Sequence, residues 1–278
     1  MKPKVNFHLH STGSDGKLKP EEVVKLSIKA GLEHICFTDH HLYPKILGKK
    51  VGWSGSVHHK EPYYKEVLRL KKKYAKKICI GYGAEFDWFE DYQAFTKKQL
   101  KSRPFDFILG AIHVFKLRDG SYFNVNDMRK DMSGPMKKYG MESIVKGYYK
   151  TLRNLIKSEL FDCVAHFDVI KIRNADKRCF SEKSKWYKDE ALKTLNVLQK
   201  SGMCMEINTG AKRAGLKGNY PAEWILKEAF KRRIPITIGS DGHKNVDLGL
   251  KEGYQMAKSV GYKTLWVFEG RKRREIKI

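Results

Sequence analysis

The first apolar stretch of the chain alternates with a period of two. Val5, Phe7 and Leu9 are separated by polar residues that include His8 and His10. This pattern is typical of a strand with one apolar and one polar face. Because successive side chains of a strand point to opposite faces, both imidazoles are expected on the same side.

A strand–helix unit then recurs along the chain. The first strand is followed by a helical pattern over 20–30, which has a proline and two glutamates in its first turn and Gly31 after its end. Further apolar runs, typical of buried strands, lie at 35–38, 78–84, 107–112, 163–165, 203–207, 236–240 and 264–268. Helical patterns lie at 62–76, 92–101, 141–158, 185–201, 221–232 and 248–260. Such alternation predicts an α/β fold with parallel strands.

The number of units favours a (β/α)7 barrel over an open doubly wound sheet. Because no linker or repeat divides the chain, we expect a single domain over 1–278, with its core at about 5–268. Two connections, 42–61 and 115–140, are too long for tight turns and are either plain surface loops or lids over a substrate. The basic segment 271–278 is expected to be a solvated tail.

Composition and charge narrow the class of protein. The 278 residues are 41% hydrophobic and 31% charged, which suits a folded chain and argues against disorder. No apolar run is long enough to cross a membrane and no signal region opens the chain, so membrane insertion and secretion are not expected. Five scattered cysteines without a C-x-x-C pair indicate a cytoplasmic protein. The net charge of +25 favours anionic partners such as phosphorylated metabolites, nucleic acid or acidic lipid.

Residues of metal-binding types follow the predicted strands. In a parallel barrel, the carboxyl ends of the strands and the following loops form the active site. The residues found there are His8, His10, Asp39, His40, Glu85, His113, His166, Glu206, Asn208, Asp241 and His243. Imidazole and bridging carboxylates suit Zn, Fe or Mn and allow ions to lie ~3.5–4 Å apart. We therefore predict a multinuclear metal site.

Seven ordered motifs carry a resemblance to a known family. They are HLHSTGSDG from His8, FTDHH from Phe37, GAEFDW from Gly83, ILGAIH from Ile108, AHFDVIK from Ala165, EINTGAKR from Glu206 and GSDGH from Gly239. Together they resemble the polymerase-and-histidinol-phosphatase (PHP) superfamily. Their order and spacing, and the aspartate at position 15, are similar to the monofunctional histidinol-phosphate phosphatases within it.

This resemblance implies a distorted (β/α)7 barrel that holds three divalent ions, for which Zn, Fe and Mn all remain candidates. The implied ligand sets are His8, His10, Glu85 and Asp241 for the first ion, Glu85, His113 and His166 for the second, and Asp15, His40 and His243 for the third. The implied reaction is the hydrolysis of L-histidinol phosphate to L-histidinol and phosphate, a step of histidine biosynthesis.

The expected chemistry follows from these ligands. A hydroxide that bridges two ions is a nucleophile near neutral pH, because metal coordination lowers the pKa of water, and it would attack the phosphorus atom. Arg213 is the first candidate for a cation that holds the phosphate; Lys171 and Arg173 are weaker candidates, with solvated side chains as the alternative. Either Asp15 or His243 would protonate the leaving alcohol.

Three further polar residues at the strand ends are expected to support this site. Asp39 precedes a predicted ligand and is expected to orient a histidine. Glu206 and Asn208 are expected to organise the end of the sixth strand and the loop that binds phosphate.

Three other interpretations stay open. The same chemistry could act on another small phosphomonoester, or on a nucleotide or nucleic-acid phosphate. Nucleic-acid binding is suggested by the net charge, but the basic residues are spread over the chain and no known nucleic-acid module is visible. A non-catalytic metal-binding protein is disfavoured because the implied ligand set is complete. The sequence does not indicate an oligomeric state.

Overall fold

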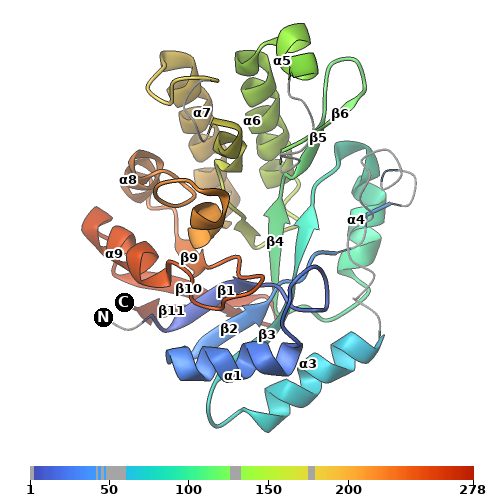
Figure 1. Cartoon of the computed structure of the whole chain (residues 1–278), viewed down its shortest axis with the longest axis vertical. Coiled ribbons are helices and arrows are strands. Elements are labelled where there is room, and N and C mark those ends of the chain that lie inside the picture. Colours follow the sequence, from blue (N-terminus) through green and yellow to red (C-terminus); the bar gives the residue numbers. More distant parts are fainter. Residues whose placement is uncertain (1–2, 42, 45–46, 48–60, 126–132, 175–178) are drawn as a thin grey trace.

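A nearly closed barrel of parallel strands forms the centre of the protein, as a computed structural model shows (Figure 1). The structure describes residues 3–41, 43–44, 47, 61–125, 133–174 and 179–278, without the side chains of Ser133 and Arg173. Within these residues the seven barrel strands are β1 (Val5–Leu9), β2 (His34–Phe37), β3 (Cys79–Asp87), β4 (Phe107–Ala111), β7 (Cys163–Val164), β8 (Cys204–Asn208) and β9 (Ile236–Gly239). They pair in that order, which confirms the predicted barrel.

The barrel closes where the segment after β9 meets β1. Leu9 and Gly242 form a parallel bridge. The backbone N–H of His10 donates to the oxygen of Gly242 over 3.0 Å. The register between β1 and β2 shifts between Asn6 and Leu9, which distorts this side of the barrel. Closure brings the carboxyl end of β1 beside the loop that follows β9.

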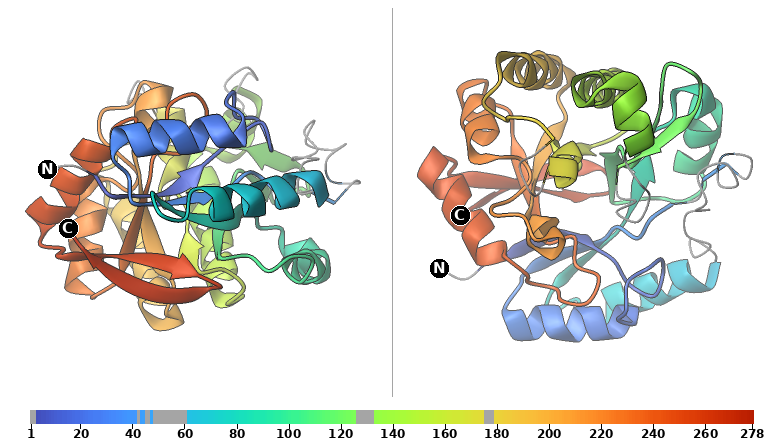
Figure 2. Two further views of the ribbon diagram at one scale, coloured as in Figure 1. Left: turned by 90° about the horizontal axis from the view of Figure 1, so that it is seen from below. Right: turned by 45° about the horizontal axis from the view of Figure 1, so that its top comes forward.

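Helices surround the barrel (Figure 2). They are α1 (Pro20–Ala30), α3 (Glu61–Lys73), α4 (Gln93–Leu100), α5 (Ser133–Tyr139), α6 (Met141–Lys157), α7 (Lys185–Ser201), α8 (Glu223–Lys231) and α9 (Leu250–Val260). Short 3-10 helices are η1 (Glu90–Tyr92), η2 (Val169–Asn174) and η3 (Thr209–Ala214). Apart from α5, each α-helix lies at or within a few residues of a stretch predicted from the sequence.

Helix α1 shows why the local signals suffice for such an element. At its start, the carboxylate of Glu22 accepts a hydrogen bond from the backbone N–H of Lys19 over 2.7 Å. At its end, Gly31 has a φ of 80°, a left-handed conformation that favours glycine because it has no Cβ. Both predicted ends of this helix are therefore confirmed.

The segment expected to be a basic tail is a strand. β11 (Lys272–Lys277) pairs antiparallel with β10 (Thr264–Glu269), although most of its side chains are exposed to solvent. The turn between them contacts the amino end of the barrel: Gly270 N–H donates to Asp106, and the Arg271 guanidinium pairs with Asp162. Asp106 and Asp162 each directly precede a barrel strand, so this segment is a paired strand fixed to the barrel, with most of its side chains solvated as expected.

The connection 115–140 also contains regular structure. Strands β5 (Val114–Lys116) and β6 (Tyr122–Asn124) form a hairpin, with the N–H of Leu117 donating to the oxygen of Ser121 over 2.7 Å. The other predicted lid, 42–61, lies mostly outside the described residues. A lid role for either connection stays a prediction.

In the part of the chain that the structure describes, no helix is both long and apolar enough to cross a membrane. All five cysteines are free, and Cys36, Cys163 and Cys204 are buried.

Candidate metal centre

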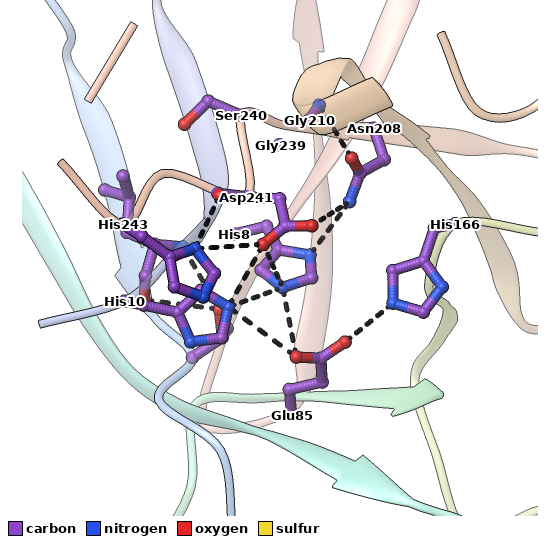
Figure 3. A network of polar contacts seen from close by, with 12 residues as sticks. His8, His10, Glu85, His166, Asn208, Gly210, Gly239, Ser240, Asp241 and His243 are labelled. Carbon is purple, nitrogen blue, oxygen red and sulfur yellow. Dashed lines mark hydrogen bonds and ion pairs between the residues drawn. The ribbon is translucent and has the colours of Figure 1, made fainter. Parts of the chain in front are cut away.

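The predicted ligands lie together at the carboxyl end of the barrel. They come from β1 and the loop after it, from β3, and from the segments that follow β2, β4, β7 and β9. Figure 3 shows His8, His10, Glu85, His166, Asp241 and His243 converging from these elements. Parallel strands all end on the same side of a barrel, so residues far apart in the chain meet here.

Glu85, in β3, is the centre of the cluster. Its Oε1 lies 2.8 Å from His166 Nε2 and 3.6 Å from His113 Nε2. Its Oε2 lies 3.1 Å from His40 Nδ1, 3.4 Å from His8 Nε2 and 3.6 Å from His10 Nε2. One buried carboxylate thus faces five imidazoles.

Glu85 and the imidazoles around it are buried, and neighbouring groups shift the pKa values of Glu85 and His10. Burial favours the protonated form of Glu85, but the nearby imidazoles of His8, His113 and His40 hold its pKa well below the usual range. Burial, together with His243 and His40, lowers the pKa of His10. A neutral imidazole and an ionised carboxylate are the forms that bind metal ions.

The structure brings together the donor atoms of each predicted ion set. The side chains of His8, His10 and Glu85 form one group, with the predicted fourth ligand Asp241 3.4 Å from His10 Nε2. Glu85, His113 and His166 form a second. The third contains His10 in addition to Asp15, His40 and His243. In each group the donor atoms lie within 4.8 Å of one another, so these imidazole and carboxylate donors fit divalent ions.

Asp15 and His243 pair on the loops at the rim of this centre. Asp15 Oδ2 lies 3.1 Å from His243 Nε2, and Asp15 Oδ1 lies 3.7 Å from His40 Nε2. Partial burial favours a protonated carboxyl, but the hydrogen bond with His243 and the neighbouring His40 and His10 hold the pKa of Asp15 far below its ordinary value. The ring of His10 stacks on that of His243, with centroids 4.2 Å apart.

Asp39 supports the loop that carries Asp15. Its carboxylate accepts from the Ser11 N–H and hydroxyl, each over 2.8 Å, from Ser14 Oγ over 2.6 Å and from the Tyr63 hydroxyl. Ser14 Oγ in turn lies 3.4 Å from His10 Nδ1. The expected orienting role thus acts on His10 through Ser14, and Tyr63 couples this loop to α3.

The predicted phosphate-binding cations lie in different surroundings. Arg213, in η3, donates to the backbone oxygen of Asp241 and places Nη2 3.2 Å from the Asp241 carboxylate. Lys171 is buried, and its ammonium binds Asp168 Oδ2 over 3.0 Å and the Asn219 oxygen over 2.7 Å. These contacts give Lys171 a structural role, and its contact with phosphate stays a prediction. The side chain of Arg173 lies outside the described residues.

Asp87 is a polar residue of the centre that sequence reasoning missed. Its carboxylate binds the N–H and the ring Nδ1 of His113, and its donor atom groups with those of His40 and His113. The signal was present, since Asp87 follows Glu85 by two residues in one strand and so shares its face.

The chain is similar to one family model and to relatives that share one name. The profile of the PHP domain matches residues 6–210. A Deinococcus radiodurans protein named probable histidinol-phosphatase is 26% identical, over 92% of this chain and 91% of that protein. The histidinol-phosphatase of Bacillus subtilis is 26% identical, over 88% of this chain and 96% of that protein.

A solved structure is similar along nearly the whole chain. It is histidinol phosphate phosphatase from Lactococcus lactis, complexed with Zn, L-histidinol and phosphate. The TM-score is 0.77 at 22% identity, and the match covers 98% of each chain. At this identity the likeness shows a shared fold.

Proposed function

The chain belongs to the PHP domain family, and from that premise we propose that it is a metal-dependent phosphomonoesterase that hydrolyses L-histidinol phosphate to L-histidinol and phosphate. The observation that carries the proposal is the convergence of five imidazoles on the buried Glu85 carboxylate, each within 3.6 Å of one of its oxygens. The names of the relatives supply the substrate, and a role in histidine biosynthesis follows from it.

We assign three divalent ions to this centre. The proposed ligands are His8, His10, Glu85 and Asp241; Glu85, His113 and His166; and Asp15, His40 and His243. Ions bound there would neutralise phosphate charge and activate water as a nucleophile. The Lactococcus lactis relative was crystallised with Zn, and Fe and Mn suit the same donor types.

The chain's own residues would hold and protonate the substrate. The Arg213 guanidinium stands beside Asp241 at the edge of the first ligand set, where a phosphate above that set would meet its forked N–H groups. At the rim, Asp15 Oδ2 lies 3.1 Å from His243 Nε2. This pair is the proposed source of the proton for the leaving alcohol.

Phosphate release tests the proposal. The protein, supplied with Mn, Fe or Zn, is assayed on L-histidinol phosphate beside sugar phosphates, nucleotides, a 5′-phosphorylated oligonucleotide and an aryl phosphate. We expect kcat/KM to be at least roughly 100-fold higher for histidinol phosphate, because the site must recognise its polar groups. Absence of turnover above a His8→Ala control would refute the enzyme, and activity without that preference would leave the chemistry and refute the substrate.

A further inference from the structure

We propose that Glu206 is a positioning residue that fixes both His8 and His166, and so couples two of the predicted metal-binding groups. The inference rests on the proposed metal-dependent function. Glu206 lies in β8, which is hydrogen-bonded to β7 on one side and to β9 on the other, and it is fully buried. Its side chain is not exposed to solvent.

One oxygen of Glu206 sets the ring of His8. Glu206 Oε1 lies 2.6 Å from His8 Nδ1. An ionised carboxylate only accepts hydrogen bonds, so this contact places a proton on Nδ1. The lone pair of a neutral His8 ring is then on Nε2, which faces Glu85 Oε2 at 3.4 Å. Glu206 thus selects the tautomer that can bind an ion of the first group.

The other oxygen of Glu206 holds the backbone of His166. Glu206 Oε2 accepts from the His166 N–H over 2.9 Å. His166 has a φ of 25°, a left-handed conformation that is unfavourable for a residue with a Cβ and persists only where the surroundings impose it. The same residue directs Nε2 to Glu85 Oε1 at 2.8 Å, in the second group. One side chain therefore positions a predicted ligand in each group.

A third donor, on Asn208, also faces the Glu206 carboxylate. Asn208 Nδ2 donates to Glu206 Oε2 over 3.0 Å, so the two carboxylate oxygens face three donors. Packing is equally tight, because a Cβ on Gly239 would lie 2.3 Å from His8 Cβ and 2.4 Å from Glu206 Oε1. The absence of a side chain at Gly239 gives β9 room to approach the pair.

A carboxamide cannot replace this carboxylate. In Glu206→Gln, one end of the side chain is a donor. If the amide oxygen accepts from His8, the NH2 group meets the donors of His166 and Asn208. If it turns, the amide oxygen still accepts from both His166 and Asn208, so this orientation is the expected one. The NH2 group then faces His8 Nδ1, and the proton of that ring moves to Nε2, where it blocks metal binding.

Zinc binding to the full chain tests the role of Glu206 without any phosphate substrate. Affinity for Zn²⁺ is measured by competition with a chromophoric chelator for the wild type, Glu206→Gln and Glu190→Gln. Glu190 is the matched control, because it is also a buried glutamate but binds Arg153 on the outer helices. We expect roughly 10–100-fold weaker zinc binding in Glu206→Gln and wild-type affinity in Glu190→Gln.

A spectroscopic readout separates positioning from loss of packing. In zinc-loaded protein labelled with 15N-histidine, His8 should show a protonated Nδ1 in the wild type and in Glu190→Gln, and should lose this signature in Glu206→Gln. If the Gln variant does not fold, Glu206→Asp takes its place. Its shorter carboxylate accepts at both oxygens, so His8 should keep its Nδ1 proton while zinc affinity falls.

The outcomes distinguish this inference from the proposed function. Wild-type zinc affinity in a Glu206 variant, or an unchanged His8 signature in Glu206→Gln, would overturn the role of Glu206 and leave the enzyme proposal intact. A wild-type protein that takes up no zinc, iron or manganese would overturn both. Failure to hydrolyse histidinol phosphate, with zinc binding as expected, would overturn the substrate alone.

Discussion

The carboxylate of Asp87 binds His113 twice. Its Oδ1 accepts from the backbone N–H over 2.8 Å, and its Oδ2 lies 3.0 Å from the ring Nδ1. The hydroxyl of Tyr43 donates to Oδ2 as well. Burial disfavours the charged imidazole, but Asp87 and Glu85 raise the pKa of His113 to about 9 in the protein without ions. Asp87 thus anchors the ring of a predicted ligand at its backbone and its side chain.

Replacement of Asp87 should weaken metal binding at the second group. Three donors face the Asp87 carboxylate, and Asp87→Asn replaces one of its oxygens by an NH2 group that must face one of these donors. We therefore expect roughly 10–100-fold lower zinc affinity or activity. Asp91→Asn is the control, since Asp91 is exposed and pairs with Lys116. Chelator competition measures the affinity, and equal values for the two variants would contradict the assignment.

Arg213 should act on substrate binding through the shape of its guanidinium. Arg213→Lys keeps the charge but loses the fork that suits a phosphate, so we expect a drop in kcat/KM of about 10-fold or more. The neighbouring Lys212 pairs with Glu252 on α9, and Lys212→Ala should leave kcat/KM unchanged. Steady-state kinetics on histidinol phosphate measures kcat/KM for both variants. If Arg213→Lys is as active as the wild type, a forked contact between Arg213 and the phosphate is excluded.

Removal of metal ions should lower both activity and thermal stability. Without ions, Glu85 and the surrounding imidazoles leave charged groups in a buried site. A ligand that binds only the folded state adds about 2.7 kcal/mol to the free energy of unfolding when its free concentration is 100 times its Kd. Dialysis against a chelator should lower Tm, and Zn or Mn should restore it. Calcium, which prefers oxygen ligands, should not. A Tm that is insensitive to the chelator would argue against bound ions.

Gly239 should tolerate no side chain. The Cβ in Gly239→Ala would fall 2.3 Å from the Cβ of His8, so we expect a loss of about 1–3 kcal/mol in the free energy of unfolding. Gly134→Ala is the matched control in helix α5, because its Cβ would meet no atom within 4 Å. That variant should be as stable as the wild type or slightly more so. Urea denaturation of both variants checks the difference.

The ion pair of the buried Glu190 with the half-buried Arg153 should make the stability of the protein depend on pH in the acid range. Burial would raise the pKa of Glu190, but hydrogen bonds from Arg153 and Lys193 lower it below its ordinary value of about 4.3. A carboxyl whose pKa is lower in the folded protein than in the unfolded chain stabilises the fold at any pH above its pKa in the unfolded chain. This stabilisation is lost as the pH falls through the pKa of the folded protein. Urea denaturation should show Glu190→Gln less stable than the wild type at pH 7, with the difference shrinking from about pH 5 downwards. A difference that does not change with pH would contradict this.

Elements with strong local signals could be predicted from the sequence. Helices α1 and α7 begin and end at the predicted residues, and each is followed by a glycine with positive φ, Gly31 or Gly202. The short strands β5 and β6, with three residues each, carry too little alternation to be recognised. β11 was missed for another reason, because its charged side chains point to solvent and its partner is supplied only by the fold.

The sequence by itself determined the types of ligand and the end of the barrel where they lie. Histidines and carboxylates that follow successive parallel strands must share one end, whatever the details of packing. Their roles as ligands stay a prediction that metal binding will test.

Only the tertiary structure decided which of these atoms meet. Glu206 and His8 are 198 residues apart in the chain, and closure of the barrel sets the 2.6 Å between them. The same packing turned Lys171 to a buried aspartate and Arg213 to the rim. A sequence pattern specifies the face on which a side chain lies, but the contact that it makes depends on distances between strands that only the folded barrel sets.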